Sequence, residues 1–317
     1  MTTRRQVIAG TAGAVLAGTL ARGGVPTVRA ADPVKVGSKN FTEALILGEM
    51  YAQLLEAAGI PVERRLNLGG TAVAQAALVK GDIDLYPEYT GTGLTVILQM
   101  PIESVQRATP EAGATPTAGT IDERVYEIVK DAYKKQFDLV WLDQSPFNNT
   151  QALAVKQDFA KEKGIATISD LAKIAGDLTI VAPSDFVERA DGLKGLEEFY
   201  GMKFGNVLAV EPGIRYQALE DGQAQVVLAF GTDGQVAGMN LLLLKDDKSL
   251  WPPYHVAPVV RQATLDAYPT LAGTLNKVAP LLTDQVMSGL NWKVDGPDKQ
   301  EPADVAKAFL QEQKLVS

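Results

Sequence analysis

Apolar residues along this chain fall alternately into short strand-like runs and into longer segments with helical spacing. A first strand is predicted over Val34 to Gly37 and a second over Val62 to Leu68. Between them, apolar residues recur every three or four positions from Leu47 to Ala58, which is typical of a helix that buries one face. The alternation continues to the end of the chain and favours an α/β fold with parallel-type sheets.

The same short apolar runs predict the remaining strands. These are Ile83 to Tyr89, Leu139 to Leu142, Gln151 to Val155, Leu178 to Ala182, Val207 to Val210, Val226 to Phe230, Leu241 to Leu244 and the run that follows two prolines in Trp251 to Arg261. Helices are predicted over Ile121 to Tyr133, Tyr216 to Asp221 and most of Ala263 to Val316. Pro87 cannot donate to a sheet, so its strand is expected at an edge or at its own end.

Two helix starts carry capping residues. Asn40 is expected to cap the first helix, with Glu43 three residues later in the position of a capping box. Thr71 is expected to cap the second helix, and Gly81 suits its left-handed exit.

The stretch from Gly69 to Gly93 combines these elements with candidate chemistry. Its strand delivers Tyr86 and Tyr89 into the turn Thr90-Gly91-Thr92, so ring faces and hydroxyl donors meet at a strand end. Ligands of α/β proteins bind at such ends. Taken alone, this stretch is better explained as a well-packed turn with core tyrosines.

Residues 1–31 have the features of an export signal. Arg4 and Arg5 precede a small-residue apolar run, and Val28-Arg29-Ala30 forms a cleavage site. TRRQVIAG resembles a twin-arginine signal, and Sec export is the alternative. The segment Ser104 to Thr120 is rich in Ala, Thr, Pro and Gly, which predicts a surface loop.

Composition excludes several function classes. The 317 residues include no cysteine and one histidine, His255, so neither a disulfide frame nor a thiolate or His-rich metal site is expected. A net charge of −8 without a basic run argues against nucleic-acid binding. No phosphate-binding loop or nucleophile elbow is present, and Asp82 is better explained as turn chemistry than as an acid or base. We therefore expect neither an enzyme nor a cofactor.

Seven motifs, in order along the chain, resemble those of one family. They are SKNFTE (38–43), GDIDLYPEYTGT (81–92), FNNTQALAV (147–155), ERADGLKGL (188–196), GIRYQAL (213–219), FGTDGQV (230–236) and YHVAPVVR (254–261). The family is the substrate-binding proteins of glycine betaine/choline-type osmoprotectant ABC importers. The resemblance runs from about Val34 to the C-terminus, and SKNFTE together with YPEYTGT is its most specific part.

The resemblance implies a two-lobed periplasmic binding protein fold of type II, the venus flytrap. Each lobe has a central mixed sheet flanked by helices, and the ligand lies between the lobes. Residues 32–146 and 236–317 are assigned to lobe 1 and residues 147–235 to lobe 2, after the signal at 1–31. The chain is expected to cross between lobes at Phe147 to Thr150 and to return at Phe230 to Gly234.

The resemblance also implies the ligand-binding residues. A quaternary ammonium would be held by the cage positions Tyr89, Gln151, Phe230 and Tyr254, because it has no N–H to donate and must be held by ring faces. A carboxylate would be held by Lys39, Thr92 and Arg189, and Asn149 at the first crossing completes the set. Gln151 stands where an aromatic residue is expected, and Phe230 where a tyrosine is common.

Two of these positions have simpler explanations from the sequence alone. Lys39 before the first helix is either a solvated lysine or a cation beside helix N–H groups. Arg189 is either a surface arginine paired with Asp191 or Glu188, or a guanidinium fork that binds a carboxylate.

The function implied is capture of a quaternary-ammonium compatible solute and its delivery to a membrane-bound ABC permease. The protein is expected to be a periplasmic or other extracytoplasmic monomer after signal cleavage. One alternative is a binding protein for another small zwitterion, such as an amino-acid derivative. A less favoured alternative is an enzyme on a similar two-lobed fold.

Overall fold

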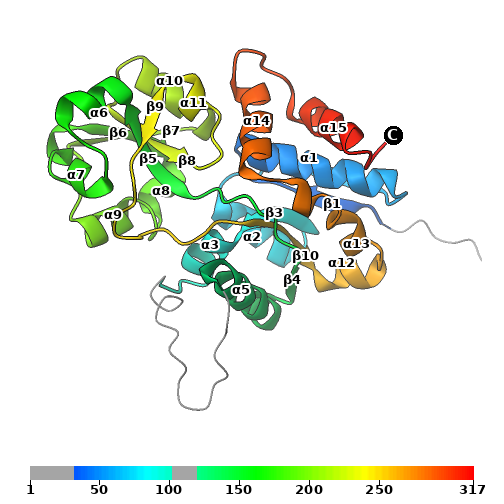
Figure 1. The fold of residues 1–317 in the computed structure, drawn as a ribbon. Helices are drawn as coiled ribbons and strands as arrows, with labels where there is room; N and C mark the ends of the chain where they lie inside the picture. Colours follow the sequence, from blue (N-terminus) through cyan, green and yellow to red (C-terminus); the bar gives the residue numbers. More distant parts are fainter. Residues whose placement is uncertain (1–31, 102–119) are drawn as a thin grey trace, which may run out of the picture. The chain divides into compact units, whose positions relative to one another are not determined.

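The computed structural model describes residues 32–101 and 120–317. The predicted export signal lies outside the described residues, as does the predicted loop at 104–120 apart from Thr120. Residues 33–317 form one compact unit, and its strands assemble into two separate five-stranded sheets. We call each sheet with its helices a lobe (Figure 1).

Both sheets have five strands and the same pattern of parallel and antiparallel pairs. Lobe 1 contains β2 (Val62–Arg65), β1 (Val34–Gly37), β3 (Leu85–Tyr89), β10 (Val256–Arg261) and β4 (Leu139–Trp141). Lobe 2 contains β7 (Asn206–Val210), β6 (Thr179–Pro183), β8 (Val226–Phe230), β5 (Gln151–Lys156) and β9 (Leu241–Leu243). In each sheet the first three strands are parallel, and the fourth runs antiparallel to both of its neighbours. Both sheets are therefore mixed.

Helices cover these sheets. In lobe 1 they are α1 (Thr42–Ala57), α2 (Thr71–Lys80), α3 (Thr90–Thr92), α5 (Ile121–Phe137), α12 (Gln262–Ala267), α13 (Leu271–Leu275), α14 (Asp284–Asp295) and α15 (Pro302–Glu312). In lobe 2 they are α6 (Gln157–Lys163), α7 (Ile168–Ala172), α8 (Ser184–Glu188), α9 (Leu193–Tyr200), α10 (Arg215–Glu220) and α11 (Gln235–Gly238). Short non-α turns occur at Gly93–Ile97, Ala175–Asp177, Pro212–Ile214 and Ala279–Leu281.

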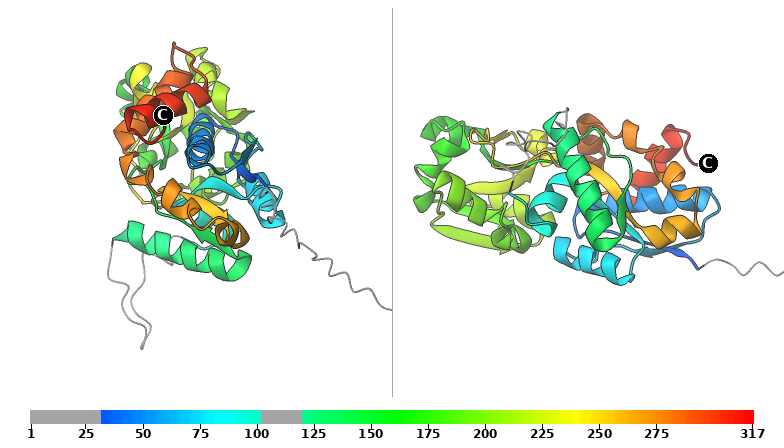
Figure 2. Two further views of the ribbon diagram at one scale, coloured as in Figure 1. Left: turned by 90° about the vertical axis from the view of Figure 1, so that its right-hand side faces the viewer. Right: turned by 90° about the horizontal axis from the view of Figure 1, so that it is seen from below.

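Helix α1 is the centre of the lobe 1 core. Its Leu47, Met50 and Leu55 are fully buried, and α15 packs along it although it lies at the other end of the sequence (Figure 2). None of the described helices is long and apolar enough to cross a membrane.

Strand direction places the pocket-forming segments at one edge of each sheet. The parallel strands β1, β3, β6, β7 and β8 end at this edge. The antiparallel strands β5 and β10 begin there, because each enters its sheet in the opposite direction. Residues just after the parallel strands and just before the antiparallel strands therefore lie around the same space.

The two crossings between lobes lie side by side. Asn148 pairs with His255 as an antiparallel bridge, and Tyr254 N donates to Asn148 Oδ1 at 2.8 Å. Asn149 N donates to the carbonyl of Tyr254 at 3.1 Å. Each crossing leads directly into the antiparallel strand of the lobe it enters.

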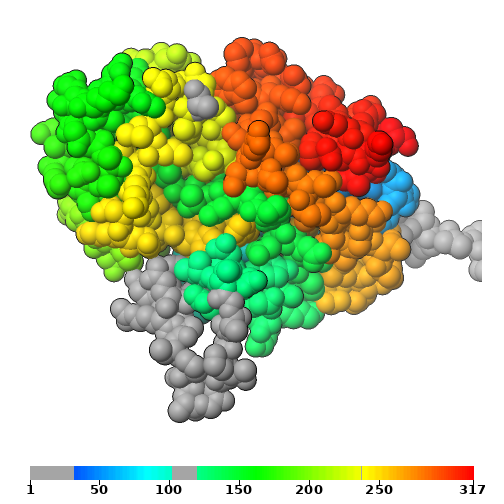
Figure 3. All heavy atoms as spheres, in the orientation of Figure 1, coloured from blue at the N-terminus to red at the C-terminus, as the bar shows by residue number. Residues whose placement is uncertain are grey.

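The return crossing differs from the prediction. β9 pairs with β5, and Lys245 bridges to Thr167, so both belong with lobe 2. In Figure 3 the yellow residues around β9 lie over the green of lobe 2. The chain therefore returns at residues 252–255 rather than at Phe230 to Gly234, and the boundary predicted after residue 235 moves with it. Three consecutive leucines do not reveal which sheet they pair with.

The predicted position of Pro87 is also wrong. Pro87 lies in β3, the middle strand of its sheet, where it faces Pro258 of β10. Two residues without N–H can face each other without loss only in a non-hydrogen-bonded pair, so this pair costs no hydrogen bond between β3 and β10.

The predicted caps also differ. α1 is capped by Phe41 and α2 by Gly70, neither through a side chain, so Asn40 and Thr71 do not cap. The left-handed exit at Gly81 is confirmed, with φ of 84°.

The contact between the β8–α11 loop and α14 gives a first prediction. A Cβ added to Gly234 would lie 2.7 Å from Trp292 Cβ and 3.1 Å from the backbone oxygen of Ser288. Because these atoms cannot swing away, Gly234→Ala should destabilise the fold by about 1–3 kcal/mol and lower the Tm by several degrees. Gly213→Ala is the matched control, since its Cβ would meet nothing within 4 Å. Equal calorimetric Tm values for the two variants would contradict this packing.

Candidate functional site

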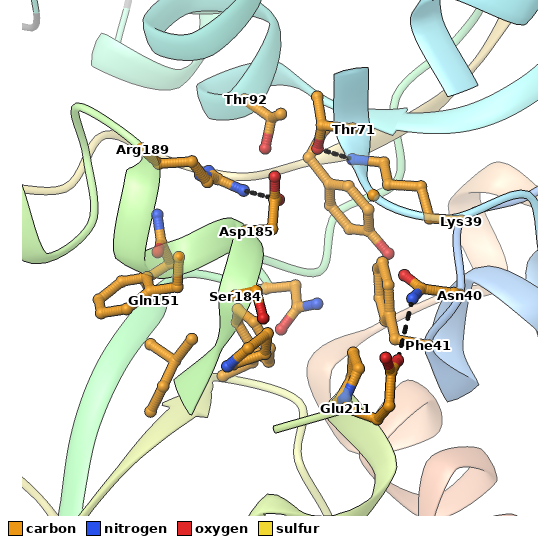
Figure 4. Close-up of a pocket in the computed structure, with 18 of the residues that line it drawn as sticks. Lys39, Asn40, Phe41, Thr71, Thr92, Gln151, Ser184, Asp185, Arg189 and Glu211 are labelled. Carbon is orange, nitrogen blue, oxygen red and sulfur yellow. Dashed lines mark hydrogen bonds and ion pairs between the residues drawn. The ribbon is translucent and has the colours of Figure 1, made fainter. Parts of the chain in front are cut away.

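A pocket of about 240 Å³ lies between the strand ends of the two lobes. Lobe 1 contributes residues after β1, β2 and β3, and lobe 2 contributes residues after β6 and β7 and at the end of β8. Figure 4 shows Thr71 and Thr92 of lobe 1 opposite Asp185 and Arg189 of lobe 2. Because drug-sized ligands occupy roughly 300–1,000 Å³, this volume suits a small molecule.

All eight residues predicted to bind the ligand line this pocket. They are Lys39, Tyr89, Thr92, Asn149, Gln151, Arg189, Phe230 and Tyr254. Their contact with a ligand remains a prediction. The further lining residues include Phe41, Asp185 and Glu211, which the sequence analysis did not single out.

Lys39 is buried and already has an anionic partner. Its Nζ lies 2.6 Å from Glu88 Oε1 and donates to Thr71 Oγ1 at 3.2 Å. The same Nζ lies 5.2 Å from the centroid of the Tyr89 ring. Burial lowers the pKa of Lys39, and the carboxylate of Glu88 offsets part of that shift. The solvated-lysine interpretation is therefore wrong.

Arg189 is held by a neighbouring carboxylate. Its Nε and Nη2 donate to the two oxygens of Asp191 at 2.7 and 2.6 Å, which is a bidentate pair. Its Nη1 lies 3.6 Å from Asp185 Oδ2. Burial alone would lower the pKa of Arg189, but the charge of Asp191 holds it above its usual value. The pairing with Asp191 is thus present, while Arg189 also lines the pocket.

The carboxylate of Asp191 accepts hydrogen bonds from two cage positions, Gln151 and Tyr254, and from lobe 1. Its Oδ2 accepts from Gln151 Nε2 at 2.9 Å and from Tyr254 OH at 2.6 Å. Thr95 of lobe 1 donates to the same oxygen at 3.0 Å. Gln151 Nε2 also donates to Tyr254 OH at 2.7 Å. Gln151 and the hydroxyl of Tyr254 therefore form a polar corner of the pocket.

The aromatic wall is a row of three rings. The centroids of Phe41 and Tyr89 are 6.0 Å apart, and those of Phe41 and Phe230 are 6.3 Å apart in a stacked arrangement. Arg215 lies behind Phe230, with its guanidinium carbon 5.1 Å from the ring centroid. Phe41 is the member that the sequence analysis missed, although SKNFTE places it two residues after Lys39.

His255 is a structural residue at the crossings. It is buried, and its Nδ1 lies 2.9 Å from the carbonyl oxygen of Phe147. Within residues 32–101 and 120–317, no group of three His, Cys, Asp or Glu side chains could hold a metal ion.

Comparison with known proteins identifies the family. A family model described as the substrate-binding domain of the ABC-type glycine betaine transport system matches residues 32–312. The chain belongs to this family. The glycine betaine-binding protein YehZ of Escherichia coli K12 is 34% identical over 288 residues, which cover 87% of this chain and 90% of that protein. This substrate-binding domain thus resembles its curated relatives over most of its length.

Two further relatives extend the comparison. The ergothioneine transport permease/ergothioneine binding protein EgtU of Helicobacter pylori G27 is 34% identical over 280 residues. The match covers 88% of this chain but 47% of that protein, so the chain spans about half of its length. A crystal structure of a glycine betaine/carnitine/choline ABC transporter is 31% identical, has a TM-score of 0.66 and is matched over 99% of its length and 89% of this chain. These comparisons confirm the type II two-lobed fold and a role in solute capture for ABC transport.

The buried Lys39–Glu88 pair predicts a pH effect. Glu88→Gln removes the charge that keeps Lys39 protonated, so the already lowered pKa of Lys39 should fall further. If the ligand carboxylate needs charged Lys39, affinity for glycine betaine should fall in the variant as pH rises from about 6 to about 9. In the wild-type protein the same loss should begin at a higher pH, because Glu88 raises the pKa of Lys39. Isothermal titration at several pH values measures this, and a flat profile in a folded variant would contradict a carboxylate-binding role for Lys39.

Proposed function

We propose that this substrate-binding protein captures a small quaternary-ammonium zwitterion of the glycine betaine class and delivers it to an ABC permease. The single observation that carries the proposal is the pocket itself, in which a row of aromatic rings lies beside Lys39, Thr92 and Arg189. Ring faces suit a trimethylammonium group, and donors suit a carboxylate.

The carboxylate end of the ligand would lie between Lys39, Thr92 and Arg189. Among the described residues, Thr92 Oγ1 has no hydrogen-bond partner, and Arg189 Nη1 has only the long contact with Asp185. These donors are therefore available in addition to the Nζ of Lys39. Because Glu88 and Asp191 already neutralise the two cations, the donors are held in place before the ligand arrives.

The trimethylammonium end would lie against the aromatic row. Lys39 already lies over the Tyr89 ring, and Arg215 over the Phe230 ring. Phe41 is the ring of the three with no protein cation over it among the described residues. We infer that Phe41 carries much of the cation–π attraction for the ligand.

A second candidate ligand is a larger amino-acid betaine. The polar corner of Gln151, Tyr254 and Asp191 favours a ligand that carries an additional polar group. The name of the Helicobacter relative points in the same direction, because that protein binds ergothioneine. A ligand panel separates this candidate from glycine betaine.

The remaining expectations complete the proposal. The protein acts as an extracytoplasmic monomer after its signal is cleaved near Ala31, by the twin-arginine or the Sec route. It captures its ligand without chemical change, in line with its transport relatives.

A thermal-shift panel tests the function. Glycine betaine, carnitine, choline and ergothioneine would be added to the protein lacking residues 1–31. A ligand in hundredfold excess over its Kd stabilises the native state by about 2.7 kcal/mol, so a zwitterionic ligand should raise the Tm clearly. Choline lacks the carboxylate and should shift the Tm less than glycine betaine. No shift with any quaternary amine would contradict the proposal, and a shift with ergothioneine alone would favour the second candidate.

The role of Phe41 gives a further prediction. Phe41→Leu keeps an apolar side chain but removes the ring face, so affinity for the quaternary amine should fall by about 0.5–2 kcal/mol. The matched control is Phe159→Leu, a partly buried aromatic of α6 outside the pocket, which should leave the Kd unchanged. Calorimetric Kd values for both variants decide this. Equal affinity of Phe41→Leu and wild type would mean that the cation does not use this ring.

A further inference from the structure

Glu43, in the first turn of α1, turns its side chain inward instead of capping its helix. The residue is 2% exposed. No lysine or arginine of the described residues lies within ion-pair distance of its carboxylate. Burial raises the pKa of Glu43, and hydrogen bonds from Thr232, Asn291 and Tyr89 act in the opposite direction. A buried carboxyl without a cation is costly unless its oxygens are hydrogen-bonded.

Four side chains supply those hydrogen bonds. Oε1 accepts from Tyr89 OH at 2.7 Å and from Asn149 Nδ2 at 2.8 Å. Oε2 accepts from Thr232 Oγ1 at 2.5 Å and from Asn291 Nδ2 at 2.9 Å. One carboxyl group therefore satisfies four buried donors.

The four donors come from four different parts of the fold. Tyr89 ends β3, Asn149 lies in the first crossing, Thr232 follows β8 of lobe 2 and Asn291 lies on α14. The Nδ2 of Asn291 also donates to the backbone oxygen of Thr232 at 3.0 Å. Glu43 thus ties lobe 1 to the first crossing and to the adjacent loop of lobe 2.

The orientation of the Asn149 amide depends on Glu43. Asn149 Oδ1 and Asn291 Oδ1 have no hydrogen-bond partner among the described residues, so the contact with Glu43 orients the Asn149 side chain. Asn149 lines the ligand pocket.

The ring of Tyr89 depends on the same carboxyl group. Tyr89 is buried, and its hydroxyl donates to Glu43. This bond fixes how far the ring extends toward Phe41 on one side and Lys39 on the other. Glu43 is not among the residues that line the ligand pocket, but it lines an adjoining cavity that shares Phe41 and Asn149 with that pocket. It would act on the ligand pocket through Tyr89 and Asn149.

We propose that Glu43 is a positioning residue of the binding site, which fixes the Tyr89 ring and the Asn149 amide and couples both to the crossing between lobes. The proposal rests on the proposed function for its ligand, but its structural part concerns the ligand-free protein.

The test compares Glu43→Ala with Tyr89→Phe, their double variant and a matched control. Tyr89→Phe keeps the ring and removes only the hydroxyl that reaches Glu43. Glu49→Ala is the control, because Glu49 is also a buried glutamate of α1 but pairs with Arg64, away from the pocket. Kd for glycine betaine and Tm are measured for each variant. Amide hydrogen exchange of the ligand-free proteins is followed at residues 148–150 and 231–232.

The expected pattern separates positioning from general stability. Glu43→Ala should weaken binding about tenfold or more, Tyr89→Phe should weaken it severalfold, and the double variant should lose little beyond Glu43→Ala. Glu49→Ala should lower the Tm while its Kd stays within about twofold of wild type. Exchange at both segments should be faster in Glu43→Ala than in Glu49→Ala.

Several outcomes would overturn the proposal. One is a lower Tm with unchanged Kd in Glu43→Ala, and another is fully additive losses in the double variant. If Glu43→Ala does not fold, unchanged affinity of Tyr89→Phe would overturn it and a severalfold loss would support it. If the wild type binds no quaternary amine, the proposed function fails, and the exchange rates alone decide whether Glu43 holds the crossing.

Discussion

The pairing of the two crossings is the constraint on which the rest of the structure depends. Asn148 and His255 hold the segments together, and each segment then enters a sheet against the direction of the strand beside it. This reversal brings the start of β5 and the start of β10 to the edge where the parallel strands end. Gln151, Tyr254 and the loops after β1, β3, β6 and β7 meet there because of strand direction.

Charge neutralisation inside the protein shapes how the site can recognise a ligand. Lys39 and Arg189 are both paired inside the protein, Lys39 with Glu88 and Arg189 with Asp191. A ligand carboxylate therefore adds to a neutral network and gains from fixed hydrogen-bond donors more than from net charge. A zwitterion fits such a site better than a free anion, because its own charges also cancel.

The sequence predicted the elements and the lining residues better than it predicted their partners. Strand-like runs located nearly every strand within a few residues, and the motifs placed eight residues that do line one pocket. Strand pairing was harder to predict than strand location. The sheet that Leu241–Leu243 joins and the position of Pro87 within its sheet depend on strands far away in the sequence. Glu43 stood in capping position, and only its distant donors draw it inward.

Protein cations already lie over two of the three rings, and they limit how strongly those rings can attract the ammonium group of a ligand. Lys39 lies over Tyr89 and Arg215 over Phe230, so those π faces already attract positive charge from within the protein. Asp233 accepts from Arg215 and Tyr216, and Glu88 accepts from Lys39 and Tyr86, so carboxylates beside the rings offset both cations. Without those carboxylates, a ligand ammonium would meet uncompensated positive charge at both ends of the row. In the proposed binding mode, affinity for a quaternary amine therefore depends on acidic residues that lie behind the pocket wall as much as on the rings that form it.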